Sequence, residues 1–208
     1  MGCAAGLILA ALRYRRRTGK GMFIDVSQQE SAVALVGGDV LAYQISGQEP
    51  ERRGNRSPLC APHNTYPCAG EDRWVTIAAN DHQWRLLAET IGGPELAADS
   101  RFATVHSRLQ HQDELDGIIM DWTKNRDAYG ICRQLQELGV PSSPVLRGPD
   151  LLSDPHYAAR GTFVTVDHPQ VGPRRYSGMA WKMSATPGEV RWPSPTLGQH
   201  NRQVYGQL

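Results

Sequence analysis

The sequence lacks the features that mark several classes of protein. Its longest apolar stretch, Leu7 to Leu12, is far shorter than the roughly 20 residues of a membrane-spanning helix. Arginines follow it instead of a cleavage site, so we expect no signal peptide and a cytoplasmic location. The four cysteines form no C-x-x-C pair, which favours reduced thiols. The net charge of +1 gives no electrostatic reason to expect a nucleic-acid partner.

Catalytic and metal-binding motifs are also missing. The seven histidines have no H-E-x-x-H or other ligand spacing, so no metal site is predicted. No G-x-S-x-G, G-x-G-x-x-G or Walker sequence occurs. Asp25 is the one carboxylate within a predicted buried strand, and no second titratable group lies near it in the sequence. We therefore interpret Asp25 as a structural hydrogen-bond acceptor and not as a catalytic group.

The stretch from Gly6 to Tyr43 predicts a helix, a strand and a second helix. The first helix ends at Thr18, where basic residues precede a glycine-containing stop. Met22 to Val26 is β-branched and aromatic and predicts a strand, and Ser27 with Glu30 forms the capping box of the next helix. A strand that leads directly into a helix indicates an α/β layer.

The middle of the chain predicts a small α+β body. The turn-rich segment from Gln48 to Pro62 is interpreted as a loop that crosses between two bodies. Residues 63–147 then predict a hairpin, three main helices and a returning strand at Pro144 to Leu146, with a core containing Trp74, Trp84 and Trp122. Residues 148–208 predict two helical turns, a second hairpin and one late helix near Asn201. The division is therefore 1–62, 63–147 and 148–208.

Several motifs resemble those of the family III CoA-transferases, the group of carnitine dehydratase and bile-acid-inducible protein F. The run from Ala10 to Glu30 is similar to the family pattern A-L-x-x-R-x-R-T-G-x-G-x-x-V-D-V-S-x-x-E. Further matches follow in family order across the chain: Gly54-Asn55-Arg56, Ala61-Pro62-His63, Tyr66-Pro67, Ala78-Ala79-Asn80-Asp81 with Trp84, Arg101-Phe102, Gly139-Val140-Pro141, Asp154-Pro155 and Leu197-Gly198-Gln199-His200-Asn201.

The resemblance implies an architecture. Family members are about twice as long as this chain, so the chain resembles their C-terminal half. Residues 1–62 would form the C-terminal part of a large Rossmann-like domain, residues 63–147 a small α+β domain, and residues 148–208 a return segment to the large domain. Family members are interlocked dimers. The partner implied here is a second copy or a separately encoded N-terminal half, and the apolar stripe from Leu7 to Leu12 is expected to associate.

The resemblance also implies an activity, with alternatives. The first reading is a half of an acyl-CoA:carboxylate CoA-transferase, with coenzyme A thioesters as substrates and no other cofactor. The second is a half of an α-methylacyl-CoA racemase, and the third is a non-catalytic remnant. Asn80-Asp81 before Trp84 matches transferases better than the A-I-E-P-Q-F pattern of racemases. The absence of a glycine run between Gly54 and Pro62 disfavours oxalate or formate chemistry.

The nucleophilic aspartate of the family precedes the matching region, so no catalytic residue is predicted and the chain alone is expected to be inactive. We predict that five residues line the substrate and CoA pocket: Ser27, Asn55, Arg56, His63 and Tyr66. Ser27 would do so at a helix start, where backbone amides favour an anion. Asn55-Arg56 is open to two interpretations, an anion-holding loop or a solvated one.

Overall fold

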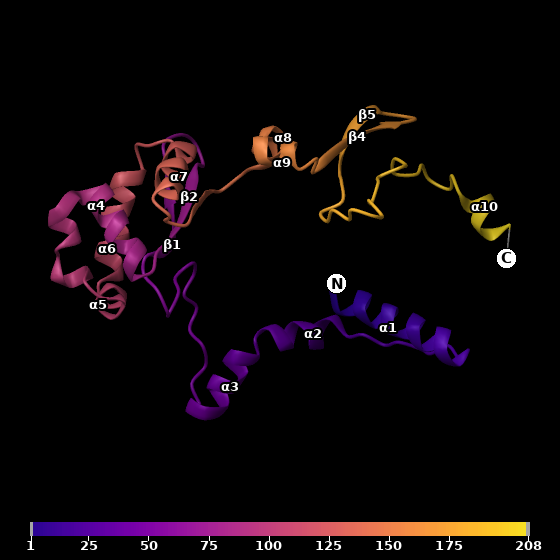
Figure 1. The fold of residues 1–208 in the computed structure, drawn as a ribbon, viewed down its shortest axis with the longest axis horizontal. Coiled ribbons are helices and arrows are strands. Elements are labelled where there is room, and N and C mark those ends of the chain that lie inside the picture. Colours follow the sequence, from indigo (N-terminus) through magenta and orange to yellow (C-terminus); the bar gives the residue numbers. More distant parts are fainter. Residues whose placement is uncertain (1, 207–208) are drawn as a thin grey trace. The chain divides into compact units, whose positions relative to one another are not determined.

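A computed structural model describes residues 2–206 of the chain, with side chains from residue 4 onward. The chain divides into two compact units, Met1–Gly54 and Asn55–Leu208. Figure 1 shows the elements of both. This division into two units does not test the sequence-based boundaries at residues 62 and 147, which stay predictions.

The first unit consists of helices. Helix α1 (Gly2–Thr18) ends as predicted, because Gly19 adopts a positive φ of 72° and its amide donates to the Arg15 carbonyl. The predicted second helix is two helices, α2 (Gln28–Leu35) and α3 (Gly37–Ser46), which are separated at Val36 immediately before Gly37-Gly38.

The strand predicted over Met22 to Val26 is wrong. These residues have no regular secondary structure, and no other described segment of the first unit is a strand. A strand needs a hydrogen-bonded neighbour, which the first unit does not supply. The prediction that Asp25 is buried is wrong for the same reason, since its side chain is exposed.

None of the side chains from residue 4 to residue 54 is buried. Large apolar side chains of this unit are exposed instead, and Phe23 is 91%, Leu35 88% and Ile45 79% exposed. Helix α1 contributes Leu7, Ile8, Leu9 and Leu12 to the same set. The apolar stripe predicted from the sequence is therefore present, and it has no partner layer within this unit.

The second unit begins with a three-stranded antiparallel sheet. Strands β1 (His63–Pro67) and β2 (Trp74–Ala78) form the predicted hairpin, with Tyr66 opposite Val75. Gly70 in its turn has a φ of 104°, which glycine tolerates best. Strand β3 (Ser142–Pro144) pairs with β2 on the other edge, two residues earlier in the chain than predicted.

The helices beside this sheet are close to those predicted (Figure 1). Asn80 caps α4 (Asp81–Ala97) in a reciprocal capping box with Gln83, and Gly93 bends the helix. Asp127 caps the last helix of the group through the Gly130 amide, as expected. The sequence reasoning missed two short elements, the 3₁₀ turn η1 and helix α5. The remaining bounds are η1 (Ser100–Phe102), α5 (Val105–Gln110), α6 (Gln112–Thr123) and α7 (Ala128–Glu137).

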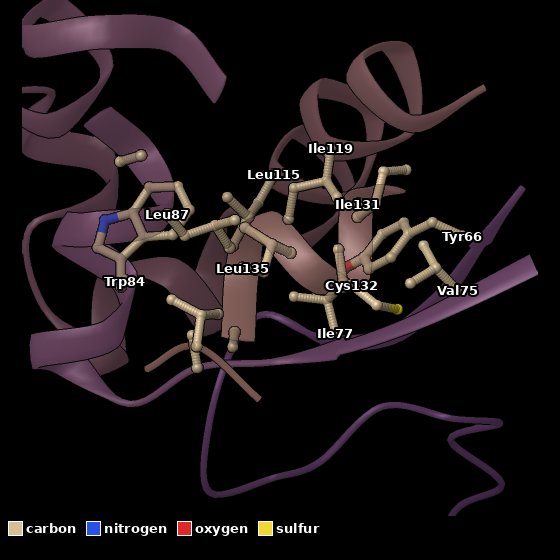
Figure 2. Close-up of a cluster of buried hydrophobic side chains, with 14 of the residues drawn as sticks. Tyr66, Val75, Ile77, Trp84, Leu87, Leu115, Ile119, Ile131, Cys132 and Leu135 are labelled. Atoms are coloured by element: carbon tan, nitrogen blue, oxygen red, sulfur yellow. The ribbon is translucent and has the colours of Figure 1, made fainter. Parts of the chain in front are cut away.

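The buried core lies between the sheet and these helices. In Figure 2, Val75 and Ile77 from β2 point toward Ile131 and Leu135 from α7. Each fully buried side chain of this size contributes about 1.5–3 kcal/mol relative to exposure. The buried members of the cluster are Ala61, Tyr66, Cys68, Val75, Ile77, Ala79, Trp84, Leu87, Ala88, Phe102, Leu115, Ile119, Ala128, Ile131, Cys132, Leu135 and Val140.

The three tryptophans predicted in this core differ in how far they are buried. Trp84 is 3% exposed and packs edge-on against Phe102, with ring centroids 5.8 Å apart. Trp122 is partly buried against the core. Trp74 is 38% exposed, and its indole N–H donates to Asp72, so its assignment to the core is wrong. The side chains of β2 alternate between buried and exposed. Val75 and Ile77 face the core, and Trp74 faces outward.

The rest of the second unit follows the predicted order. Asp150 of helix α8 (Gly148–Ser153) forms an ion pair with Arg73, which ties this helix to the β1–β2 turn. Its carboxyl pKa is lowered, chiefly by the hydrogen bond from Arg73. A second antiparallel hairpin and a late helix follow. The bounds are α8 (Gly148–Ser153), α9 (Pro155–Ala159), β4 (Phe163–His168), β5 (Gly172–Ser177) and α10 (Asn201–Tyr205).

Candidate functional site

Asp116, on the buried face of α6, accepts four hydrogen bonds. Its Oδ2 accepts from Arg56 Nε at 3.0 Å, Arg56 Nη2 at 2.7 Å and Asn64 Nδ2 at 3.0 Å. Its Oδ1 accepts from the Tyr66 hydroxyl at 2.7 Å. The residue is only 6% exposed. A buried carboxylate is stable when donors replace its lost water, and these four do so. We call Asp116, Arg56, Asn64, Tyr66 and Asp113 the Asp116 cluster.

Arg56 is held by two carboxylates of α6. Its Nη2 lies 2.7 Å from Asp113 Oδ1 as well as 2.7 Å from Asp116 Oδ2. The hydrogen bond to Asp113 is the main cause that raises the pKa of Arg56, with Asp116 acting in the same direction and burial opposing both. The guanidinium is thus paired with two carboxylates and stays 36% exposed, and both interpretations of Asn55-Arg56 remain predictions. Its predicted place in a pocket lining stays a prediction.

His63 and Asn55 meet across the loop. His63 Nδ1 lies 2.7 Å from the Asn55 carbonyl oxygen. Because a carbonyl oxygen only accepts, Nδ1 is assigned the proton. Asn55 Nδ2 donates to Thr65 Oγ1 at 3.2 Å. Both His63 and Asn55 are exposed, so their remaining polar groups can reach a ligand.

Tyr66 differs from the other predicted lining residues because it is 1% exposed. Burial, followed by the nearby Asp116 charge, raises the pKa of its phenol well above the ordinary value. The hydroxyl therefore stays protonated and donates to Asp116. In this structure Tyr66 supports the cluster from inside the core.

Ser27 lies in the first unit, and the other four predicted residues lie in the second. Its Oγ accepts from the Glu30 amide at 3.1 Å, which is one half of the predicted capping box; the reciprocal bond from the Ser27 amide to the Glu30 carboxylate is absent from the described structure. Hydrogen bonds bring the other four together as two pairs: His63 is bonded to the Asn55 carbonyl, and Arg56 and the Tyr66 hydroxyl both donate to Asp116 of α6.

The sequence reasoning missed Asp116 and Arg108. Asp116 lies next to Leu115 and near Ile119 on the buried face of α6. A carboxylate on a helix face that is otherwise apolar was the signal in the sequence that could have indicated a hydrogen-bonded buried group. Arg108 is 0% exposed and donates to the carbonyls of Ala61 and Phe102 and to the Asp81 carboxylate. No sequence pattern marks Arg108 as buried, because arginine is rarely fully buried.

Other candidate chemistry in the second unit is limited. Burial raises the pKa of the Cys68 and Cys132 thiols to about 11, so neither is a thiolate at neutral pH. A groove of about 590 Å³ has walls from α7, from Ser143, Pro144 and Leu146, and from α9, and none of the five predicted residues lines it. Among residues 2–206, no His, Cys, Asp and Glu side chains are grouped to hold a metal ion.

Comparisons with known proteins place the chain in a family. The model of CoA-transferase family III matches residues 1–201. The chain therefore belongs to this family, and the resemblance of its motifs is confirmed. A solved CaiB/BaiF family protein from Brucella suis has a TM-score of 0.78 at 30% identity, with 97% of this chain and 52% of that chain covered. The fold is that of the C-terminal half of such proteins.

Two curated relatives carry specific names. A succinyl-CoA–D-citramalate CoA-transferase from Chloroflexus aurantiacus is 41% identical over 96% of this chain and 50% of its own length. A succinyl-CoA:mesaconate CoA-transferase from Haloarcula hispanica is 33% identical over 95% of this chain and 49% of its own length. The chain thus spans about half the length of the curated relatives that it matches.

Proposed function

We propose that this chain forms the C-terminal half of an acyl-CoA:carboxylate CoA-transferase, which moves CoA from an acyl-CoA to a free carboxylic acid. The observation that carries the proposal is the continuous match over residues 1–201 to a family whose similar members are named CoA-transferases. The coenzyme A thioester is a substrate in this proposal, and no additional cofactor is required. The proposed location is the cytoplasm. No described helix is both long and apolar enough to cross a membrane.

The proposed nucleophile comes from the part of the enzyme that this chain does not match. Acyl transfer of this kind needs a carboxylate nucleophile and amides or cations that stabilise the developing negative charge. The buried Asp116 carboxylate is committed to four donors, and the buried thiols of Cys68 and Cys132 are protonated at neutral pH. The proposed role of this chain is to supply one wall of the pocket and the small domain.

The exposed apolar side chains of the first unit support a partner. Phe23, Leu35 and Ile45 are each at least 79% exposed, and α1 adds a row of leucines. Apolar surface of this extent is typical of an interface. We infer that it is covered by the segment that corresponds to the N-terminal half of the relatives, within one polypeptide or as a separate chain. A homodimer of the completed enzyme is part of the same proposal.

The proposal is tested with a fusion enzyme. The matching C-terminal half of the Chloroflexus relative is replaced by residues 1–201 of this chain, and succinyl-CoA is assayed with D-citramalate and with mesaconate. We expect CoA exchange by the fusion and none by residues 1–208 alone, because the nucleophile lies outside them. Sustained exchange by the chain alone would contradict the assignment of the nucleophile.

Other outcomes separate the alternatives. Proton exchange at the α-carbon of a 2-methylacyl-CoA, without CoA transfer, would establish the racemase reading. A fusion that folds and binds acyl-CoA but performs neither reaction would favour a non-catalytic remnant. The intact Chloroflexus enzyme is the positive control for both assays.

Substitution of Arg56 or His63 in the fusion is expected to change binding of the acid more than turnover. We expect the KM for the acid to rise about tenfold in Arg56→Ala and His63→Ala, with kcat nearly unchanged, which is the pattern of lost uniform binding. Arg85→Ala is the control, because Arg85 is 78% exposed and, among residues 4–206, pairs with Glu89 alone. Loss of all turnover with CoA binding intact would show that a catalytic residue had been treated as a lining residue.

A further inference from the structure

The segment from Asn55 to His63, here called the crossing segment, is fastened at both ends. At its start, Arg56 is bound to Asp113 and Asp116 of α6. At its end, Arg108 of α5 donates to the Ala61 carbonyl, and the Pro62 carbonyl accepts from the Ala79 amide at 3.0 Å. Between the two attachments the segment is open, and Leu59 is 82% exposed. Its two ends are therefore fixed by the small body, while Leu59 between them is exposed.

Arg108 joins three separate parts of the chain. Its Nη1 donates to the Phe102 carbonyl at 3.0 Å, its Nε donates to Ala61, and its Nη2 donates to Asp81 at the start of α4. The guanidinium carbon lies 5.7 Å from the centre of the Trp84 ring. A planar guanidinium with donors in a fixed fork determines the directions of all its partners at once. No other charged side chain in the described structure is fully buried.

The ion pair alone does not account for this arrangement. Asp81 is 66% exposed, so most of its attraction for Arg108 is screened by water. The Ala61 carbonyl, in contrast, belongs to a residue that is 0% exposed and would be left without a partner if Arg108 were removed. Removal of Arg108 would therefore deprive two buried carbonyls of this donor, those of Ala61 and Phe102, and the Ala61 carbonyl is the one in the crossing segment.

The contact between Arg108 and the Ala61 carbonyl lies close to His63, which is a predicted residue of the substrate pocket. Ala61 is two residues from His63, and His63 Nδ1 is bonded to the Asn55 carbonyl at the other end of the segment. A shift of Ala61 would be transmitted toward His63 and Asn55, against the resistance of the Pro62–Ala79 hydrogen bond and of the pairing between His63 and Ala78.

We propose that Arg108 is a positioning residue of the transferase: by holding the Ala61 carbonyl it fixes the crossing segment and the direction of His63 at the acid pocket. The proposal rests on the proposed function. It assigns to Arg108 no contact with substrate.

Hydrogen exchange on the full chain tests the attachment without any assay of activity. Arg108→Lys keeps the charge but loses the fork, and Arg108→Met keeps a similar length without donors. We expect amide exchange in residues 57–64 to rise at least tenfold in both, with little change in the α6 peptide around Leu115. Arg101→Met is the control, because Arg101 likewise lies over an aromatic ring, that of Phe102 at 5.2 Å, but pairs with Asp99 and Glu114, outside the crossing segment.

Asp81→Asn is the least disruptive of these substitutions, and it keeps the hydrogen-exchange test decisive. Asp81→Asn removes only an exposed partner of Arg108 and leaves both carbonyl contacts available, so it should fold and should leave exchange in residues 57–64 close to that of the unsubstituted chain. If Arg108→Met does not fold, Arg108→Lys is compared with Asp81→Asn. Unchanged exchange in residues 57–64 of Arg108→Lys, or an equal rise in every peptide, would overturn the proposal.

Kinetics of the fusion enzyme separate positioning from stability. We expect Arg108→Lys to raise the KM for the acid about tenfold at a temperature well below its melting point, and Arg101→Met to leave the KM unchanged. A fall in maximal rate that matches the loss of folded enzyme, with KM unchanged, would show a merely structural role. An unsubstituted fusion without activity would overturn the proposed function alone, because hydrogen exchange still decides whether Arg108 fixes the segment.

Discussion

Replacement of Asp116 by alanine is expected to lower the free energy of unfolding of the chain by about 3 kcal/mol. The change removes the acceptor of four hydrogen bonds. The Tyr66 hydroxyl would then lie in the core without a partner, since Tyr66 is 1% exposed. Urea titration followed by circular dichroism measures the loss.

Asp113→Ala is the matched control for this prediction. Asp113 contacts the same Nη2 atom of Arg56 at the same distance of 2.7 Å, but its side chain is 90% exposed. An exposed ion pair contributes little, so the expected loss is less than about 0.5 kcal/mol. Equal losses of unfolding free energy in Asp116→Ala and Asp113→Ala would mean that burial does not determine how much each carboxylate of the Asp116 cluster stabilises the chain.

Replacement of Leu135 by alanine is expected to destabilise the chain by about 3 kcal/mol, with a loss as large as about 5 kcal/mol if the cavity does not collapse. Leu135 is 0% exposed and lies on the face of α7 that meets β2 (Figure 2). The same urea titration gives the value.

Leu138→Ala provides the comparison, because Leu138 caps the same helix and is 40% exposed. Only part of its side chain leaves water on folding, so we expect a loss of about 1 kcal/mol or less. A loss at Leu138 as large as that at Leu135 would contradict the position of the core between α7 and the sheet.

The parts of the fold that sequence predicted correctly are those that short-range chemistry determines. Asn80 with Gln83 and Asp127 before Ala128 are helix caps formed within three residues, so the local sequence contains the whole interaction. The β1–β2 hairpin is similar, because its turn and its alternating strand are contiguous.

The errors occur where the outcome depends on a distant partner. Met22 to Val26 has the composition of a strand, but strand formation needs a neighbouring strand, and the described first unit offers none. Trp74 has the hydrophobicity of a core residue, yet the register of β2 turns it outward.

The sequence predicted residues of the candidate site but not the residues that hold them in place. The family motifs pointed to Asn55, Arg56, His63 and Tyr66, and the structure joins Asn55 to His63 directly and Arg56 to Tyr66 through Asp116. The residues that hold them, above all Asp116 and Arg108, come from α6 and α5. Neither residue type is expected in a core, so tertiary contacts alone reveal their burial.

The long sequence separations within the Asp116 cluster have a kinetic consequence. Tyr66 and Asp116 are 50 residues apart in the chain, and Arg56 and Asp116 are 60 apart. Contacts that close such long loops carry an entropic cost before they contribute energy, so we expect the cluster to form after the folding transition state. Removal of Asp116 would then mainly accelerate unfolding and leave the folding rate nearly unchanged. The lifetime of the folded small body and the lifetime of the ordered crossing segment would accordingly shorten together.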